Sequence, residues 1–139
     1  MEGRDSMGEI ITVFVQVGQA FTVKGRAGSA TMLLFSGYAE GEYFRGRILP
    51  GAVDCQKADE DGFMLSARYI LDGEDKNGNN CKIFIENNGV ADKNGEIHTK
   101  PLIYTDSDCL KWLETTPLEG YISEEKGILV IHICAKENV

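Results

Sequence analysis

The feature that most constrains this 139-residue chain is a series of short runs rich in β-branched and aromatic residues, separated by glycine-containing turns. Asx-Gly dipeptides tolerate the positive φ angles that tight hairpin turns require. Strand-length runs at this spacing are typical of an antiparallel sandwich or barrel. The runs span residues 10–17, 21–24, 31–36, 43–49, 63–71, 81–87 and 128–134, and the dipeptides begin at Asp61, Asp72, Asn77, Asn88 and Asn94.

One short helix is predicted over residues 107–114, with Asp106 as its N-cap. Leu110 and Leu113 share one face of this helix, and we interpret Trp112 as a plug over one end of the barrel. The sequence therefore predicts a single all-β domain over residues 9–139, an antiparallel barrel with one short helix, after a flexible extension over residues 1–8. Closure of the barrel would remove the free sheet edges that promote aggregation.

The charge balance excludes several classes of partner. The chain carries 14 basic and 22 acidic residues, a formal charge of −8. Nucleic-acid phosphates need clustered Lys and Arg, and this sequence has no such cluster. It also has no apolar run of the roughly 20 residues that cross a bilayer, and no signal peptide. We therefore expect a cytoplasmic protein without nucleic-acid or membrane partners.

Cysteine spacing argues against a metal site. The four cysteines form no C-x-x-C motif, and the chain has only two histidines to join them. Free cysteine inside a strand packs as a small apolar residue. We predict four free thiols, no metal and no cofactor; the cysteines are Cys55, Cys81, Cys109 and Cys134.

Three segments carry a family pattern: residues 46–54 (GRILPGAVD), 65–71 (LSARYIL) and 83–89 (IFIENNG). The pattern resembles that of an uncharacterised family of small bacterial and fungal proteins known as a domain of unknown function. The resemblance covers most of the chain and implies a barrel similar in outline to lipocalins and allene oxide cyclase. It implies no activity, because one fold hosts many functions. The sequence departs from the pattern at Cys55 and in the longer turn at residues 75–80.

Arg68 and Asp54 are the first candidate site residues. A charge inside an apolar strand is costly to bury unless it is paired. We expect Arg68 to face a pocket and anchor a carbonyl or carboxylate, with Asp54 as orienting group or base. The alternatives are a structural ion pair and an Arg68 that extends outward. Strand alternation does not decide between an inward and an outward Arg68. In a barrel filled with side chains, the face that carries Phe63 would turn inward and Arg68 would point to solvent.

Four further residues could line the same pocket. A carboxylate such as Glu40 could shuttle a proton if it were half-buried, although an exposed turn is the commoner environment. The amide of Asn87 could orient a ligand or cap the following turn. Tyr69 could donate a proton or pack in the core. His132 alternates with apolar residues, as a wall residue or a pocket residue would.

Three functions remain open at this stage. The first is a binding module that holds a small amphipathic or acidic molecule in the barrel. The second is a cofactor-independent isomerase or cyclase that uses Arg68 with Asp54 or Glu40. The third is a structural domain that forms a homo-oligomer. Convergence of the three charged residues in one pocket would favour the enzyme.

Overall fold

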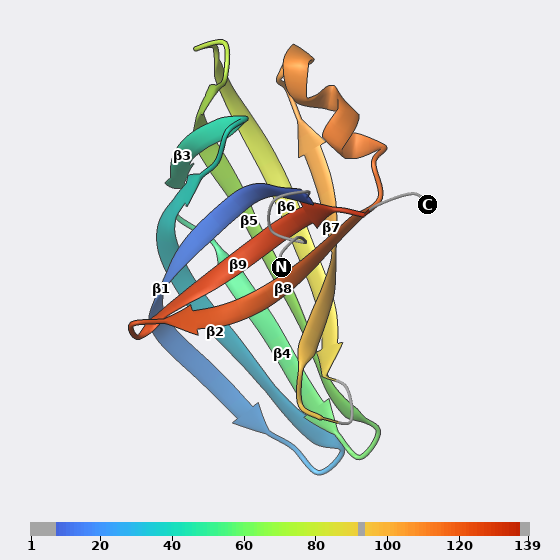
Figure 1. Ribbon diagram of the computed structural model, residues 1–139. Coiled ribbons are helices and arrows are strands. Elements are labelled where there is room, and N and C mark those ends of the chain that lie inside the picture. The colour runs from blue at the N-terminus through green and yellow to red at the C-terminus, as the bar shows by residue number, and fades with distance from the viewer. Residues whose placement is uncertain (1–7, 92–93, 137–139) are drawn as a thin grey trace.

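The computed structural model describes residues 8–91 and 94–136 (Figure 1). The predicted extension over residues 1–8 lies almost wholly outside these ranges. Within them, strands follow one another along the chain and one 3₁₀ helix, η1, interrupts the series. The elements are β1 (Glu9–Lys24), β2 (Gly28–Glu40), β3 (Phe44–Ile48), β4 (Val53–Asp59), β5 (Gly62–Asp75), β6 (Asn80–Ala91), β7 (Ile97–Thr105), η1 (Asp108–Glu114), β8 (Leu118–Glu125) and β9 (Ile128–Ala135).

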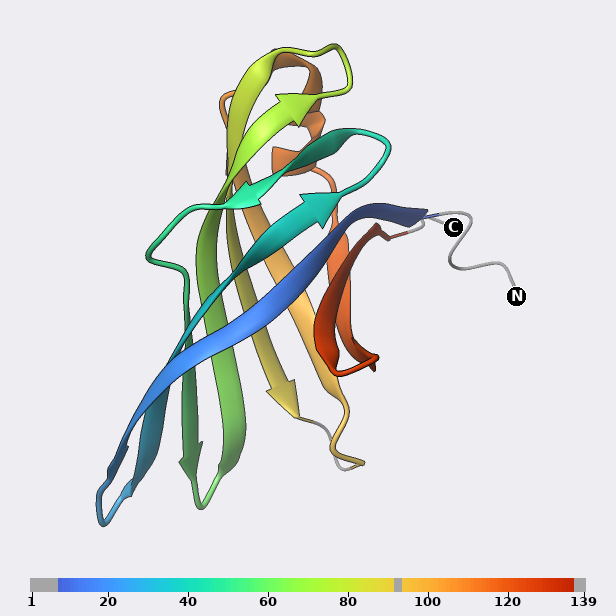
Figure 2. The same ribbon diagram turned by 90° about the vertical axis from the view of Figure 1, so that its left-hand side faces the viewer.

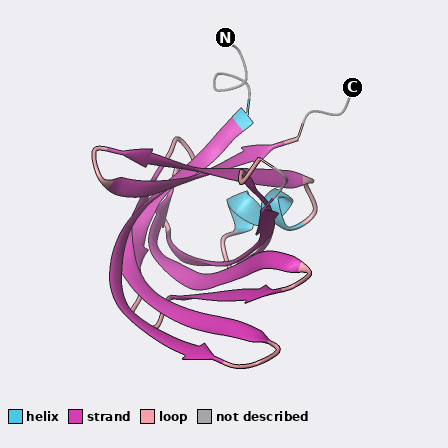
Figure 3. Cartoon of the chain, turned by 90° about the horizontal axis from the view of Figure 1, so that it is seen from below, coloured by secondary structure: helices cyan, strands magenta, loops and turns pink. Residues whose placement is uncertain are grey.

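The strands close into an antiparallel barrel, as predicted. Hydrogen-bonded neighbours run from β2 through β1, β9, β8, β7, β6 and β5, and the circle closes because β3 and β4 each pair with both β2 and β5. These two short strands share one position, so the wall has eight strand positions. Figure 3 looks into this wall from the end opposite η1.

The wall is uneven in height. Figure 2 shows the β1–β2 and β4–β5 hairpins extending well below the turn between β8 and β9. The β7–β8 seam is also short, with only His98↔Tyr121 and Thr99↔Gly120 in register, and Pro101 follows at once. Proline has no N–H to donate to a ladder, which explains why pairing stops there.

Two of the five Asx-Gly predictions are wrong. Gly62 and Gly78 have positive φ in tight turns, but Gly73 and Gly89 lie inside β5 and β6. A Cβ on Gly73 would come 2.0 Å from the carbonyl oxygen of Arg45 in β3. This glycine serves the close approach of two backbones, a role that sequence does not distinguish from a turn.

Strand prediction succeeded where β-branched residues alternate and failed elsewhere. The runs 10–17 and 21–24 form one strand, β1, with a register shift between Val17 and Ala20. Strands β4, β7 and β8 were not predicted; β4 reads VDCQKAD and β7 contains a proline. Pairing with neighbouring strands, more than the β-strand propensity of their own residues, keeps β4, β7 and β8 in the barrel wall.

The inner face of β5 is the one that carries Leu65, Ala67, Tyr69 and Leu71, all buried, whereas Arg68 is exposed. The prediction that Arg68 faces a pocket inside the barrel is therefore wrong. Burying each large apolar side chain contributes about 1.5–3 kcal/mol, and burying an unpaired guanidinium costs several. The more apolar face consequently turns inward.

Helix η1 closes one end of the barrel. Leu110 and Leu113 are 0% and 1% exposed and belong to the core. Trp112, which we had expected to be the plug, is 37% exposed and stands edge-on to Tyr43 with ring centroids 5.4 Å apart. Asp106 is not the N-cap, because its carboxylate accepts the Lys82 N–H at 2.8 Å.

A buried carboxylate joins this end to the β5–β6 turn. Asp75 accepts hydrogen bonds from the backbone N–H groups of Asn77 and Asn79 at 3.0 and 3.1 Å, and from the Ser107 hydroxyl at 2.9 Å. Burial would raise the pKa of Asp75, but these donors, with Cys109, together outweigh it and hold the pKa below its usual value.

All four cysteines are free, as predicted, and Cys81 and Cys134 are buried. Within residues 8–91 and 94–136, no helix is long and apolar enough to cross a membrane.

Candidate functional site

The strand register brings two polar side chains together on the inner wall. Asp54 on β4 and Asn87 on β6 both stand directly opposite Ala67 on β5. Opposed residues of antiparallel strands share a face, so all three point inward with Ala67. The small alanine side chain leaves space between its two polar neighbours.

These residues border a cavity of about 50 Å³ inside the barrel. Val17, one of its lining residues, is 45% exposed. Apart from the two polar side chains, the lining is apolar. It consists of Val15, Val17, Leu33, Phe35, Leu65, Ala67, Ile122, Leu129 and Ile131.

Asn87 has no exposed surface, and neither its Oδ1 nor its Nδ2 has a hydrogen-bond partner among the described residues. The Oδ1 atom of Asp54 is likewise buried and unpaired. Each such group costs about 1–3 kcal/mol of stability. Most buried polar groups in proteins are satisfied, so three unpaired atoms beside one cavity make it a candidate site.

The carboxyl group of Asp54 sits in an environment that disfavours its charge. Burial raises its pKa, and a hydrogen bond from Gln56 Nε2 to Oδ2, at 2.9 Å, opposes the shift only in part. A carboxyl of this kind holds its proton to higher pH than an exposed aspartate. It can then donate a hydrogen bond as well as accept one.

Tyr69 and Thr99 add further unpaired hydroxyls to the buried inner wall. The Tyr69 ring meets Phe35 edge-on with centroids 5.5 Å apart, and burial raises the pKa of its hydroxyl. Thr99 packs against Gly120 of β8, and a Cβ added at Gly120 would lie 2.3 Å from the Oγ1 atom of Thr99. Sequence reasoning missed Thr99 and Gln56, because β7 and β4 were not predicted as strands.

Four predicted site residues do not line this cavity, and one of them, Tyr69, is buried in the core nearby. Arg68 is exposed on the outer face, and Glu40 is exposed at the end of β2. Neither lines the cavity with Asp54, so the three charged residues do not converge. The binding roles first assigned to Arg68 and Glu40 therefore do not apply to the barrel interior.

His132 also lies on the outer wall, in line with Thr12 of β1. Its Nδ1 is 2.8 Å from Glu9 Oε2 and its Nε2 is 2.9 Å from the Ser123 hydroxyl. Glu125 Oε2 accepts the same hydroxyl at 3.0 Å and lies 3.5 Å from Nε2. These hydrogen bonds connect β1, β8 and β9 on the outer wall.

Comparison with known proteins places the sequence in context. The family model described as "Protein of unknown function (DUF3237)" matches residues 8–108. The UPF0311 protein CA_C3321 of Clostridium acetobutylicum is 35% identical over 98 residues, which are 58% of this chain and 60% of that protein.

Solved structures share the fold. A protein of unknown function from Clostridium acetobutylicum superposes with a TM-score of 0.77 at 24% identity, over 93% of this chain and 97% of that one. An enzyme from Penicillium herquei gives a TM-score of 0.68 at 14% identity, over 96% and 99% of the two chains. At these identities the likeness concerns the fold.

Proposed function

This chain belongs to the DUF3237 family, and we propose that its barrel interior binds a small, neutral, amphipathic molecule. One observation carries the proposal: the amide of Asn87 is fully buried beside an apolar cavity and is unpaired at both ends. A ligand with a hydrogen-bond donor and an acceptor at this position would pair with the amide and remove the free-energy cost of leaving it unpaired.

The lining chemistry restricts the class of ligand. Asp54 and Asn87 are the polar side chains of the cavity, and no Lys or Arg lines it. An acidic group would meet the Asp54 carboxyl without a cation to neutralise it, which is unfavourable in an apolar cavity. A hydroxyl, phenol, ketone or amide on an apolar frame fits better.

The cavity must widen to admit such a molecule. About 50 Å³ is little more than the space of a single water, whereas small-molecule sites measure roughly 300–1,000 Å³. The half-buried side chains of Leu33 and Leu129 border the cavity. Rotation of these side chains toward the open end would enlarge it, at a smaller cost than moving the closed end at η1.

The test uses N-phenyl-1-naphthylamine, a neutral aromatic amine whose fluorescence rises in apolar sites. We expect Asn87→Leu to weaken its binding roughly tenfold, because one hydrogen bond is worth about 1.4 kcal/mol. Asn80→Leu, an exposed position on the same strand, is the matched control. Equal affinity of wild type and Asn87→Leu would refute the proposal, and native mass spectrometry of fresh protein would identify a co-purified ligand.

The raised pKa of Asp54 favours a second candidate function, a cofactor-independent isomerase or cyclase. A carboxyl that keeps its proton in an apolar cavity can protonate one atom of a bound substrate and then, as the carboxylate, accept a proton from another atom. Incubation of the co-purified molecule with the protein in D₂O tests this. Deuterium uptake that disappears in Asp54→Asn would support catalysis, and no uptake with wild type would leave binding alone.

A further inference from the structure

A second concave surface lies on the outside of the barrel, across β4, β5, β6 and β7. It is a groove of about 740 Å³. The strand register builds it from two cross-strand rows. One row is Cys55, Ser66, Asn88 and Lys100, and the other is Lys57, Met64, Val90 and His98; Arg68 lies beside them.

The charge of this groove is opposite to that of the chain. Lys57, Arg68 and Lys100 line it, and no carboxylate of residues 8–91 and 94–136 does, although the whole chain has a formal charge of −8. None of the three cations forms an ion pair with any residue that the structure describes. Glu86 stands directly across from Arg68, but its carboxylate accepts a hydrogen bond from Asn88 Nδ2 at 3.0 Å.

The groove also offers apolar contact. Met64 and Val90 are 46% and 56% exposed, and they stand opposite each other in the row that begins with Lys57 and ends with His98. On the floor, the Ser66 Oγ is buried and has no hydrogen-bond partner among the described residues. Exposed apolar groups beside unpaired cations are the complement of an amphipathic anion.

We propose that this groove binds an organic anion, a carboxylate or phosphate carried on an apolar body. Arg68 and Lys100 hold the anionic group, and Met64 and Val90 pack against the body. The volume lies within the roughly 300–1,000 Å³ of small-molecule sites. Arg68 extends from the outer face of β5, opposite to the inner wall, and Leu65 lines both the groove and the interior cavity.

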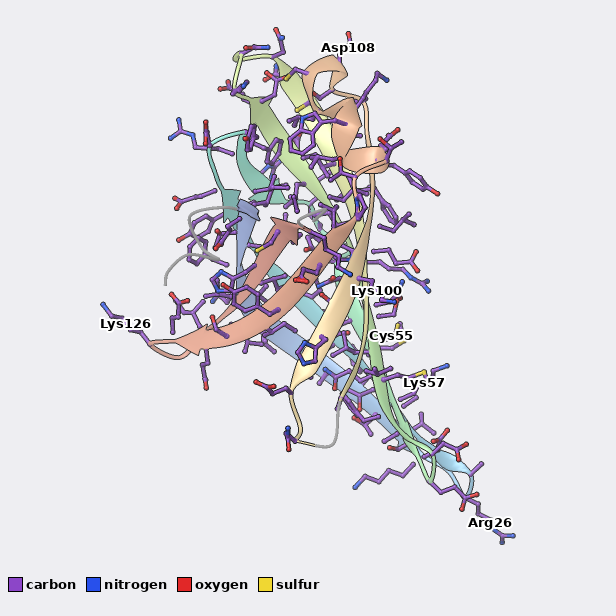
Figure 4. The ribbon with its side chains drawn as sticks, turned by 45° about the vertical axis from the view of Figure 1, so that its right-hand side comes forward. Arg26, Cys55, Lys57, Lys100, Asp108 and Lys126 are labelled. Carbon is purple, nitrogen blue, oxygen red and sulfur yellow. The ribbon has the colours of Figure 1, made fainter. Side chains whose placement is uncertain are left out.

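Decyl phosphate below its micelle concentration is the probe, and isothermal titration calorimetry gives its affinity. We expect the double variant R68Q/K100Q to bind at least about tenfold more weakly than wild type. The control R26Q/K126Q removes the same charge from exposed positions away from the groove, as Figure 4 shows, and is expected to bind like wild type. Circular dichroism checks that both variants fold.

Two further probes separate the contribution of the anionic group to affinity from that of the apolar body. Decanol tests the apolar body without charge and is expected to bind at least about tenfold more weakly than decyl phosphate. Decanoate, compared with decyl phosphate, tells which anionic group the groove prefers. Tight binding of decanol, or equal loss in both double variants, would overturn the proposal, since either result means that no specific anion contact exists.

Cys55 reports the location of the bound probe, because it lies in the groove near Lys57 and Lys100 and is half-buried (Figure 4). We expect decyl phosphate to slow alkylation of Cys55 by iodoacetamide in wild type and not in R68Q/K100Q. Cys109, half-buried on η1, is the internal control. Binding that leaves Cys55 unprotected and is lost in Asn87→Leu would contradict the proposal and assign the probe to the interior.

Discussion

The closed end of the barrel and its middle differ in whether their buried polar side chains have hydrogen-bond partners. At the closed end, Asp75 is 6% exposed and three donors satisfy its carboxylate. In the middle, Asn87 is fully buried and its amide has no hydrogen-bond partner among the residues that the structure describes. The contrast is between a region whose buried carboxylate is satisfied and a region whose buried amide is unpaired among the described residues.

A large loss of stability is expected from shortening a plug residue at the closed end. Leu113→Ala should lower the free energy of unfolding by about 2–5 kcal/mol, because it opens a cavity in a fully packed site. Leu33→Ala, in the half-buried cavity wall, should cost clearly less. Urea denaturation measures both. Equal losses would remove the distinction between a rigid end and an adaptable middle.

A smaller but pH-dependent effect is expected at Asp75. Because its folded pKa lies below the unfolded value, the carboxylate stabilises the fold above the unfolded pKa of about 3.9, and this contribution is lost as pH falls through the folded pKa. Asp75→Asn should therefore lower Tm at pH 7, and the gap from wild type should shrink below about pH 4. A Tm difference between wild type and Asp75→Asn that stays constant from pH 3 to pH 7 would show that the charge of Asp75 does not stabilise the fold.

Asp54 should behave in the opposite sense. Its folded pKa is raised, so the folded state binds the proton more tightly and loses stability as pH rises from the unfolded pKa through the folded one. Asp54→Asn should raise Tm at pH 7, by less than Asp75→Asn lowers it, and should have little effect near pH 3. A fall in Tm at pH 7 would mean that the charge is stabilised in the fold. Scanning calorimetry across this pH range decides.

Both polar groups of the cavity could be predicted from sequence, but their setting could not. Asn87 was identified because it ends an apolar alternation, and Asp54 because it follows a Pro-Gly turn. Thr99 was missed because Pro101 argued against predicting a strand at β7. The orientation of β5 depends on which of its two faces buries more apolar surface once the other strands are in place, and alternation alone cannot decide that.

The smallest effect on stability is expected at Arg68, the residue first assigned to the interior. Arg68→Gln should change the free energy of unfolding by no more than about 0.5 kcal/mol, since the side chain is exposed and forms no ion pair with a described residue. Its neighbour Tyr69, 3% exposed and inward, is the control, and Tyr69→Ala should cost about 3–5 kcal/mol by analogy with other buried aromatic residues. Urea denaturation of the two variants compares the two faces of one strand. A loss above about 2 kcal/mol in Arg68→Gln would mean that the guanidinium is buried in solution, and the inner and outer faces of β5 would then have to be exchanged.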